Sequence, residues 1–234
     1  MIELLLVVAI MAIVAYITIP SYISSQSKQK LTNSAKEVLR ILNEARNRAI
    51  AGLAIEGSDL DGDQEVEPTE TSLPGAFGVY FQRDLDLPNA SENTSRAVLF
   101  GDQDGDWEFD PNVDMVIEEL EFPYVSKIYN LELLERAGQF TIKHDVDEAI
   151  VFYRVPTGDV ALRMKDASWS DTAEMQNLQW LRVDLAMWQM ADADNKVQDT
   201  AYLRGIVAHS VSDYAYMCST IETYNDDSTA CTRD

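Results

Sequence analysis

The chain has 234 residues and a formal net charge of −22 at pH 7, from 40 acidic and 18 basic side chains. This charge is uneven, because residues 1–57 carry +2 and residues 58–234 carry −24. A strongly acidic surface repels nucleic acid and anionic membranes, which argues against a nucleic-acid partner. About 210 residues follow the apolar start of the chain, enough for one domain with a real core. A salty habitat, divalent-cation binding or solubility alone would each account for the acidity.

The most informative segment is the N-terminus, where Ile2–Ile19 is apolar except for Glu3 and is followed by Pro20. A helix of this length is about 27 Å long and can cross the hydrocarbon core of a bilayer. A carboxylate in such a span is costly and requires a partner. The segment therefore predicts a membrane helix that awaits another subunit. A generic signal anchor or secretory segment is the alternative, although neither needs Glu3.

The helical pattern continues beyond Pro20 to about residue 55. Apolar residues recur there at steps of three and four: Leu31, Ala35, Val38, Leu39, Leu42, Ala45, Ala49 and Leu53. This spacing predicts an amphipathic helix over 21–55 whose stripe packs under a globular head. Gly52 and Gly57 are candidate stops, and Pro20 predicts a kink because it removes a backbone hydrogen bond.

Short strands are expected after Gly57. The candidates are Gly78–Gln82, Ala97–Phe100, Met115–Phe122, Gln139–Lys143, Ala149–Val155, Val160–Met164, Trp180–Trp188 and Leu203–His209. Residues 151–162 are typical of a hairpin with a turn at 156–159, and Leu131–Arg136 is expected to be a short helix. We therefore predict an α+β fold with two parts. A long N-terminal helix over 1–55 (1–20 apolar, 21–55 amphipathic) packs on an acidic, antiparallel, strand-rich head over 56–234.

The N-terminus resembles a known family. Ile2-Glu3-Leu4, the apolar run Leu5–Ile19 and Pro20-Ser21-Tyr22 are similar to the mature N-terminus of bacterial type IV pilins and type II secretion pseudopilins. With the following helix, the resemblance covers about fifty residues. It implies the pilin fold and a structural subunit of an extracellular filament that polymerises through its apolar helix. It also implies that Glu3 pairs with the terminal amine of a neighbouring subunit, and that the helix near Pro20 unwinds locally in the assembled filament.

The same resemblance implies the partners and the location. The subunit would be held in the inner membrane, processed by a prepilin peptidase, N-methylated, and extracted by an assembly machine into a cell-surface homopolymer. A minor pseudopilin of a type II secretion system is the first alternative. A membrane-anchored binding module and an adhesin-type minor pilin are the others.

Two acidic loops have the same sequence pattern, D-x-D-G-D-x-E. One contains Asp59, Asp61, Asp63 and Glu65, and the other contains Asp102, Asp104, Asp106 and Glu108, followed by Asp110. Alternate carboxylates on a turn that glycine permits can converge on one hard cation, so Ca²⁺ is the candidate ligand. The prediction is weaker for the first loop. A pair of solvated turns is the alternative, since Asp and Gly are common in turns.

The remaining candidates are two cysteines and two sequons. Cys218 and Cys231 are the only cysteines, and a location in the envelope permits a disulfide between them. Many members of the resembled family close a C-terminal loop in this way; two free thiols are the alternative. Asn89 and Asn93 each begin a sequon and are candidate glycosylation sites.

Catalysis has little support in the sequence. The histidines are His144 and His209, and neither accompanies a nucleophile motif. There is also no glycine-rich phosphate loop and no H-E-x-x-H. We therefore expect a structural protein and not an enzyme.

Overall fold

The fold is known from a computed structural model that describes most of the chain. The described residues are 2–53, 55–56, 71–72, 74–83, 95–122, 126–137, 140–165, 178–187, 203–210, 215–222 and 230–233. Within the helix, the side chains at positions 2–5, 17, 20 and 21 lie outside the description.

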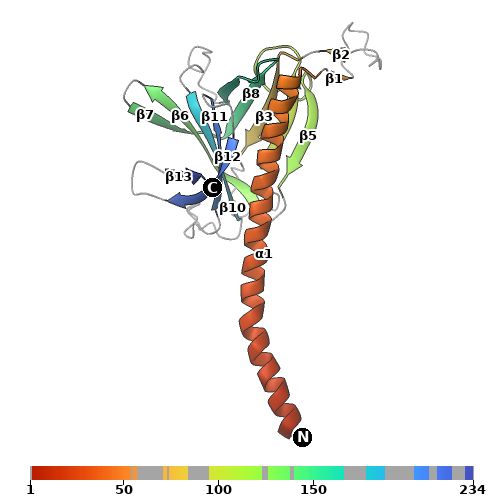
Figure 1. Cartoon of the computed structure of the whole chain (residues 1–234), viewed down its shortest axis with the longest axis vertical. Helices are drawn as coiled ribbons and strands as arrows, with labels where there is room; N and C mark the ends of the chain where they lie inside the picture. The colour runs from red at the N-terminus through yellow and green to blue at the C-terminus, as the bar shows by residue number, and fades with distance from the viewer. Residues whose placement is uncertain are drawn as a thin grey trace.

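One long helix and a set of short strands make up the described chain (Figure 1). The helix α1 covers Ile2–Ala51 as a single 50-residue element, continuous through Pro20. The strands are β1 (Ile55–Glu56), β2 (Thr71–Ser72), β3 (Ala76–Gln82), β4 (Arg96–Asp102), β5 (Met115–Glu121), β6 (Ser126–Ala137), β7 (Phe140–Asp145), β8 (Glu148–Arg154), β9 (Val160–Lys165), β10 (Leu178–Met187), β11 (Leu203–His209), β12 (Ala215–Glu222) and β13 (Ala230–Arg233).

The strands form two large antiparallel sheets and one small pair. The five-stranded sheet has the order β5-β4-β3-β8-β9, and the six-stranded sheet has the order β13-β12-β11-β10-β6-β7; β1 pairs with β2. The C-terminal half of α1 packs against β3, β4 and β8 of the first sheet and against β6, β10, β11 and β12 of the second. The N-terminal half extends away from the head (Figure 1).

The main core lies where α1 meets the two sheets. The helical stripe from Leu31 to Ala49 is fully buried there. In β3, alternate residues face opposite sides, so that Phe77 and Val79 face α1 while Tyr80 faces a second, aromatic cluster. The sheets therefore bury one face against the helix, which fixes α1 relative to the head.

Gly52 ends α1, as expected. Its φ is +57°, a conformation that glycine adopts without strain. The Gly52 N–H donates to the Ala49 carbonyl at 3.1 Å, and the Leu53 N–H donates to the Arg48 carbonyl at 3.2 Å. These two bonds satisfy carbonyls of the last turn, as in a typical glycine cap. Gly57 lies outside the described residues.

The predicted α+β fold, a long N-terminal helix on an antiparallel head, is confirmed and is consistent with a pilin-like arrangement. Strands are present at all eight predicted places, although Gln139 itself lies outside the described residues. The hairpin is confirmed, because β8 pairs with β9 from Glu148↔Lys165 to Tyr153↔Val160. Strands β1, β2, β12 and β13 were not predicted.

The short helix expected at Leu131–Arg136 is wrong, because these residues belong to the long strand β6. Leu131 and Leu133 are buried in the main core, while Glu132 between them belongs to the other face of the strand and is buried there, so alternate residues face opposite sides. β6 pairs with both β10 and β7. Pairing on both sides outweighs the modest helix propensity of Leu, Glu and Arg.

Candidate assembly helix and acidic loop

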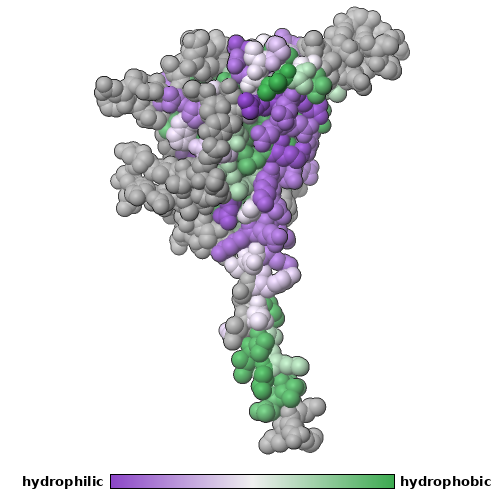
Figure 2. Space-filling view, viewed as in Figure 1, coloured by the Kyte–Doolittle hydropathy of each residue, from purple (hydrophilic) through white to green (hydrophobic). Residues whose placement is uncertain are grey.

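The N-terminal half of α1 presents large apolar side chains to solvent. Their exposed fractions are 63% for Leu6, 50% for Val7, 57% for Val8, 53% for Ile10, 67% for Met11, 61% for Ile13, 54% for Val14, 82% for Tyr16, 55% for Ile19, 64% for Tyr22 and 57% for Ile23. In Figure 2 the described residues of this half are mainly hydrophobic, and the described residues of α1 and the head above it are mainly hydrophilic on this face. An exposed apolar surface of this extent marks an interaction site.

These exposed residues surround the helix and do not form a single stripe. Leu6, Val7 and Val8 are consecutive, and successive residues of an α-helix are separated by about 100°. Apolar groups on every side suit an environment that is apolar all round, such as lipid or a bundle of helices. One groove on one partner would leave part of this surface in water.

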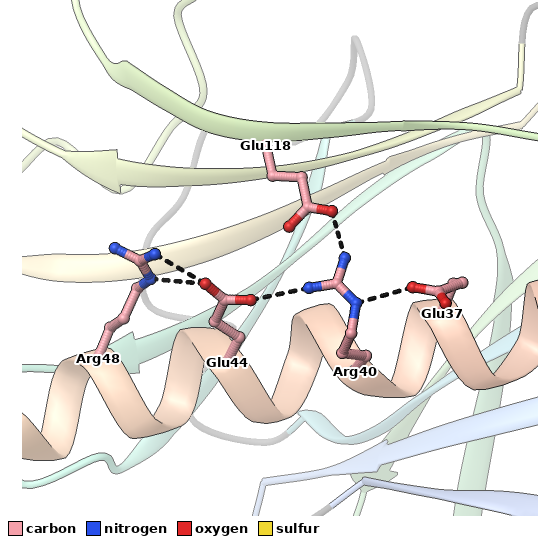
Figure 3. A network of polar contacts seen from close by, with 5 residues as sticks. All are labelled: Glu37, Arg40, Glu44, Arg48 and Glu118. Carbon is pink, nitrogen blue, oxygen red and sulfur yellow. Dashed lines mark hydrogen bonds and ion pairs between the residues drawn. The ribbon is translucent and has the colours of Figure 1, made fainter.

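The C-terminal half of α1 is tied to the head by polar contacts as well as by its buried stripe (Figure 3). Arg40 Nε lies 2.7 Å from Glu37 Oε2, and Arg40 Nη1 lies 2.9 Å from Glu44 Oε2. Arg40 Nη2 also donates to Glu118 of β5. Hydrogen bonds to Glu118 and Glu37 raise the pKa of the Arg40 guanidinium above its ordinary value. Arg48 extends the network by pairing with Glu44 at 2.7 Å.

Two of the residues expected to act in assembly can be placed only through the backbone. Glu3 and Pro20 both lie within α1, but their side chains are outside the description. The pairing of Glu3 and the unwinding at Pro20 therefore stay predictions. No stretch of helix among the described side chains has the length and hydropathy needed to cross a membrane.

The second acidic loop connects β4 to β5, and the structure brings three of its carboxylates together. Asp102 is the last residue of β4 and is fully buried, whereas Asp104 and Asp106 are exposed. Oxygens of the three carboxylates all lie within 4.8 Å of one another. This arrangement offers several hard oxygen ligands to one cation.

The other two predicted members of this loop are used differently. Glu108 forms an ion pair with Arg163 of β9. Asp110 Oδ1 accepts hydrogen bonds from the backbone N–H and the side-chain amide of Asn112, both at 2.9 Å. These two carboxylates are therefore engaged in closing the loop and do not belong to the cluster of three.

Sequence reasoning missed Asp114, which lies next to β5 and is 6% exposed. Its Oδ1 accepts from the Gln103 N–H at 3.2 Å, and its Oδ2 accepts from the Asp110 N–H at 2.9 Å. Asp114 thereby joins the beginning of the loop to its end. The signal for it was weak, since a single aspartate just beyond a turn has many possible roles.

Burial concentrates unfavourable negative charge in this loop. Burial raises the pKa of Asp102 to about 6, against a hydrogen bond from Gly105 that lowers it, and the charges of Asp114 and Asp104 raise it further. The pKa of Asp114 is also raised to about 6, again chiefly by burial, with contributions from the charges of Asp104 and Asp106. The folded loop therefore holds these carboxylates close together at a cost to their ionised forms.

Aromatic packing fixes the backbone of the loop. The Trp107 ring meets Phe152 edge to face, with centroids 5.3 Å apart, and the Arg154 guanidinium lies 5.1 Å from the Trp107 centroid. Phe109 is buried with its centroid 4.8 Å from that of Phe100. The Phe100 ring occupies the place where a Cβ on Gly78 would lie, 2.4 Å away, so glycine is required for this packing.

Arg163 also holds the loop from β9. Its Nη1 donates to the carbonyls of Asp106 and Trp107 at 3.0 and 2.5 Å, and its Nη2 pairs with Glu108. Arg163 thus binds the backbone and the outer glutamate. It makes no ion pair with the three clustered aspartates in the described part of the chain.

Several other predicted residues lie outside the described part of the chain. These are Asp59, Asp61, Asp63 and Glu65 of the first acidic loop and the sequon residues Asn89 and Asn93. Their proposed roles stay predictions.

The cysteine pair is only half described. Cys218 is buried in β12, and no free thiol is found among the described residues. β12 pairs with β13, in register Ile221↔Cys231. Because the side chain of Cys231 is outside the description, its bond to Cys218 stays a prediction.

The two histidines occupy strands of the six-stranded sheet. His144 Nε2 in β7 lies 3.2 Å from Glu135 Oε2 of β6, and His209 ends β11.

The comparisons with known proteins found no match. No family model matches the chain, no curated protein matches it, and no solved structure matches it.

Proposed function

We propose that this protein is the structural subunit of a type IV pilus-like filament and that it polymerises through the N-terminal half of α1. The observation that carries the proposal is the row of exposed apolar side chains from Leu6 to Ile23 on a helix whose other half is fixed in a folded head. Burial of each large apolar side chain contributes about 1.5–3 kcal/mol. Eleven such side chains therefore strongly favour lipid or a bundle of helices over water as the surroundings of this half of α1.

The charge of the head also supports association through the apolar helix and not through the heads. Residues 58–234 carry −24, so heads of neighbouring subunits repel one another at low salt. The adhesive surface must therefore be found elsewhere, and the apolar helix carries no charged side chain from residue 4 to residue 27. We expect the helices to bundle in the filament centre and the acidic heads to coat the outside.

In the proposed mechanism, residues 2–19 first hold the subunit in the inner membrane. Assembly then exchanges lipid for the side chains of neighbouring helices, which costs little because both environments are apolar. By the resemblance to pilins, Glu3 pairs with the terminal amine of the adjoining subunit, which offsets the cost of its charge in the apolar bundle. This pairing fixes the axial register between subunits.

Substitution of Glu3 tests the proposal directly. Glu3→Ala is expected to leave the subunit folded and membrane-inserted but to stop filament growth, because the axial pairing is lost. Electron microscopy of sheared filaments, with mass spectrometry of the same material and of the membrane fraction, gives both readouts. Glu37→Gln, which removes one charge from the docked half of the same helix, is the matched control and should give normal filaments.

Three outcomes would contradict the proposal. Normal filaments of the Glu3→Ala protein would refute the pairing. Filaments that lack the wild-type chain, with the chain kept in the membrane as a monomer, would favour a membrane-anchored binding module. A chain present only in traces at the base or tip of filaments would indicate a minor pseudopilin or a minor pilin.

A further inference from the structure

One buried carboxylate oxygen in the β4–β5 loop has no hydrogen-bond partner in the described part of the chain. Asp102 is 0% exposed, and its Oδ1 accepts a hydrogen bond from the Gly105 N–H at 2.8 Å. Its Oδ2 is also buried but has no hydrogen-bond partner among the residues that the structure describes. A buried carboxylate oxygen without a partner carries a large desolvation cost. A ligand at this position would remove that cost.

The surroundings of this carboxylate indicate what the ligand is. Oxygens of Asp102, Asp104 and Asp106 lie within 4.8 Å of one another. Two oxygens bound to one Ca²⁺ at 2.3–2.6 Å are at most about 4.6–5.2 Å apart. The three carboxylates are therefore already spaced to share one ion, and the shared chemistry is that of a hard divalent cation.

No cation of the protein takes this place in the described structure. None of the three aspartates forms an ion pair there, and Arg163 of β9, which contacts the loop, is bound to Glu108 and to two backbone carbonyls. Asp114 adds a further buried carboxylate, but both of its oxygens accept backbone N–H groups. Among the described residues, therefore, no protein cation forms an ion pair with the cluster.

We propose that the β4–β5 loop binds Ca²⁺ through the carboxylates of Asp102, Asp104 and Asp106. Asp102 supplies the buried ligand at the end of β4, and the two exposed aspartates close over the ion from the loop. Water completes the coordination on the open side, since Ca²⁺ accepts six to eight oxygen ligands in flexible geometry. Mg²⁺ demands near-ideal octahedral geometry and gives up its water reluctantly, so it should bind this loop more weakly.

Asn substitutions in the exposed ligands test the proposal with little risk to the fold. Asp104 Oδ1 accepts from the Asp106 N–H at 3.2 Å, and Asp106 Oδ1 accepts from the Glu108 N–H at 2.7 Å. Asparagine keeps an Oδ1 acceptor, so Asp104→Asn and Asp106→Asn preserve these turns and remove only charge. Glu119→Gln is the control, because it removes one exposed charge from β5 in the same sheet.

The experiment uses the full chain in detergent, stripped with EDTA and titrated with CaCl₂ or MgCl₂ in a calorimeter at constant ionic strength. We expect one Ca²⁺ site with a Kd of about 0.1–1 mM, as in weak extracellular sites, and weaker Mg²⁺ binding. Each Asp→Asn variant should weaken Ca²⁺ by about tenfold or more, and Glu119→Gln should stay within about twofold. Absence of a saturable Ca²⁺ site up to 10 mM (about ten times the weakest expected Kd), or equal losses in the control, would overturn the proposal.

Trp107 provides an independent way to locate the ion. Tb³⁺ occupies Ca²⁺ sites and emits when a nearby excited tryptophan transfers energy to it. Trp107 lies between Asp106 and Glu108, whereas Trp180 lies in β10 of the other sheet. Ca²⁺-displaceable emission should therefore be lost in Trp107→Phe and kept in Trp180→Phe. Emission that survives Trp107→Phe would place the ion elsewhere. The result does not depend on filament formation.

Discussion

The two halves of α1 belong to one continuous helix but differ in what covers them. From Leu31 to Ala49 the apolar residues form one stripe that is buried between two sheets. From Leu6 to Ile23 the apolar residues occupy every side and are exposed. The docked half (Leu31–Ala49) is therefore covered by its own chain, while the exposed half (Leu6–Ile23) presents an apolar surface that the described part of the chain does not cover.

The largest expected effect comes from placing a charge in the exposed half. Ile10→Asp should abolish filament assembly, because a carboxylate in an apolar interior costs about 2.5–3.5 kcal/mol for each subunit. The thermal unfolding of the head should not change, since Ile10 is 53% exposed on the half of α1 that extends away from the head (Figure 1). Electron microscopy and head unfolding are measured on the same preparation. Asn33→Asp, at an exposed position in the docked half, should change neither readout. Normal filaments of the Ile10→Asp protein would contradict the view that the exposed half of α1 enters an apolar environment.

Truncation of a single apolar residue in each half should give opposite results. Leu42 is fully buried, so Leu42→Ala should lower the free energy of unfolding of the head by about 2–5 kcal/mol. Ile13 is 61% exposed, so Ile13→Ala should change that free energy by less than about 0.5 kcal/mol. Urea denaturation in detergent measures both. Equal effects would mean that the exposed half also packs on the head.

A third test concerns the contact between Gly158 and Ile50 near the C-terminal end of α1. A Cβ on Gly158 would lie 2.6 Å from Ile50 Cγ1, and Gly158 has a φ of +73°. Gly158→Ala should therefore lower the free energy of unfolding by about 1–3 kcal/mol through overpacking and strain. Adding Ile50→Ala should recover the part due to the clash but not the part due to φ. Strictly additive losses in the double variant would show that the two residues do not touch.

The smallest effect is expected from the polar network of the docked half. Arg40 is 41% exposed, so its coupling to Glu118, measured with Arg40→Met and Glu118→Gln, should be about 0.2–1 kcal/mol. High salt should reduce this coupling. Glu119 pairs instead with Arg96, and a cycle of Arg40→Met with Glu119→Gln should give no coupling. A coupling of several kcal/mol for Arg40 and Glu118 would mean that polar contacts, and not the apolar stripe, dominate the docking.

The predictable parts of this molecule are those governed by local rules. The stripe from Leu31 to Ala49 repeats with the period of a helix, and Gly52 is suited to the left-handed conformation that ends it. The β8–β9 hairpin follows from two apolar runs around a turn. Each of these features depends on residues that are close together in the sequence, so the sequence alone is enough to predict it.

The acidic loop was predicted only in part. The repeated aspartates predicted a shared cation site, and the structure brings oxygens of Asp102, Asp104 and Asp106 close together because a turn brings alternate residues together. Glu108 belongs to the same motif, but Arg163, 55 residues away in the sequence, pairs with it. Asp114 becomes part of the loop only because its two oxygens accept backbone N–H groups on both sides. Interactions between residues far apart in the sequence produce no periodic pattern, so the sequence does not predict them.

The sequence by itself determined the long helix, its apolar start, its stop at Gly52 and the α+β class, since periodicity and glycine conformation are local properties. The tertiary structure alone decided that residues 131–136 form a strand and that Glu118 docks Arg40 across 78 positions. It also buries one oxygen of Asp102 where no described residue gives it a hydrogen bond. These features depend on which distant segments meet, and that outcome depends on burying the largest apolar area of the whole chain, which no single segment encodes.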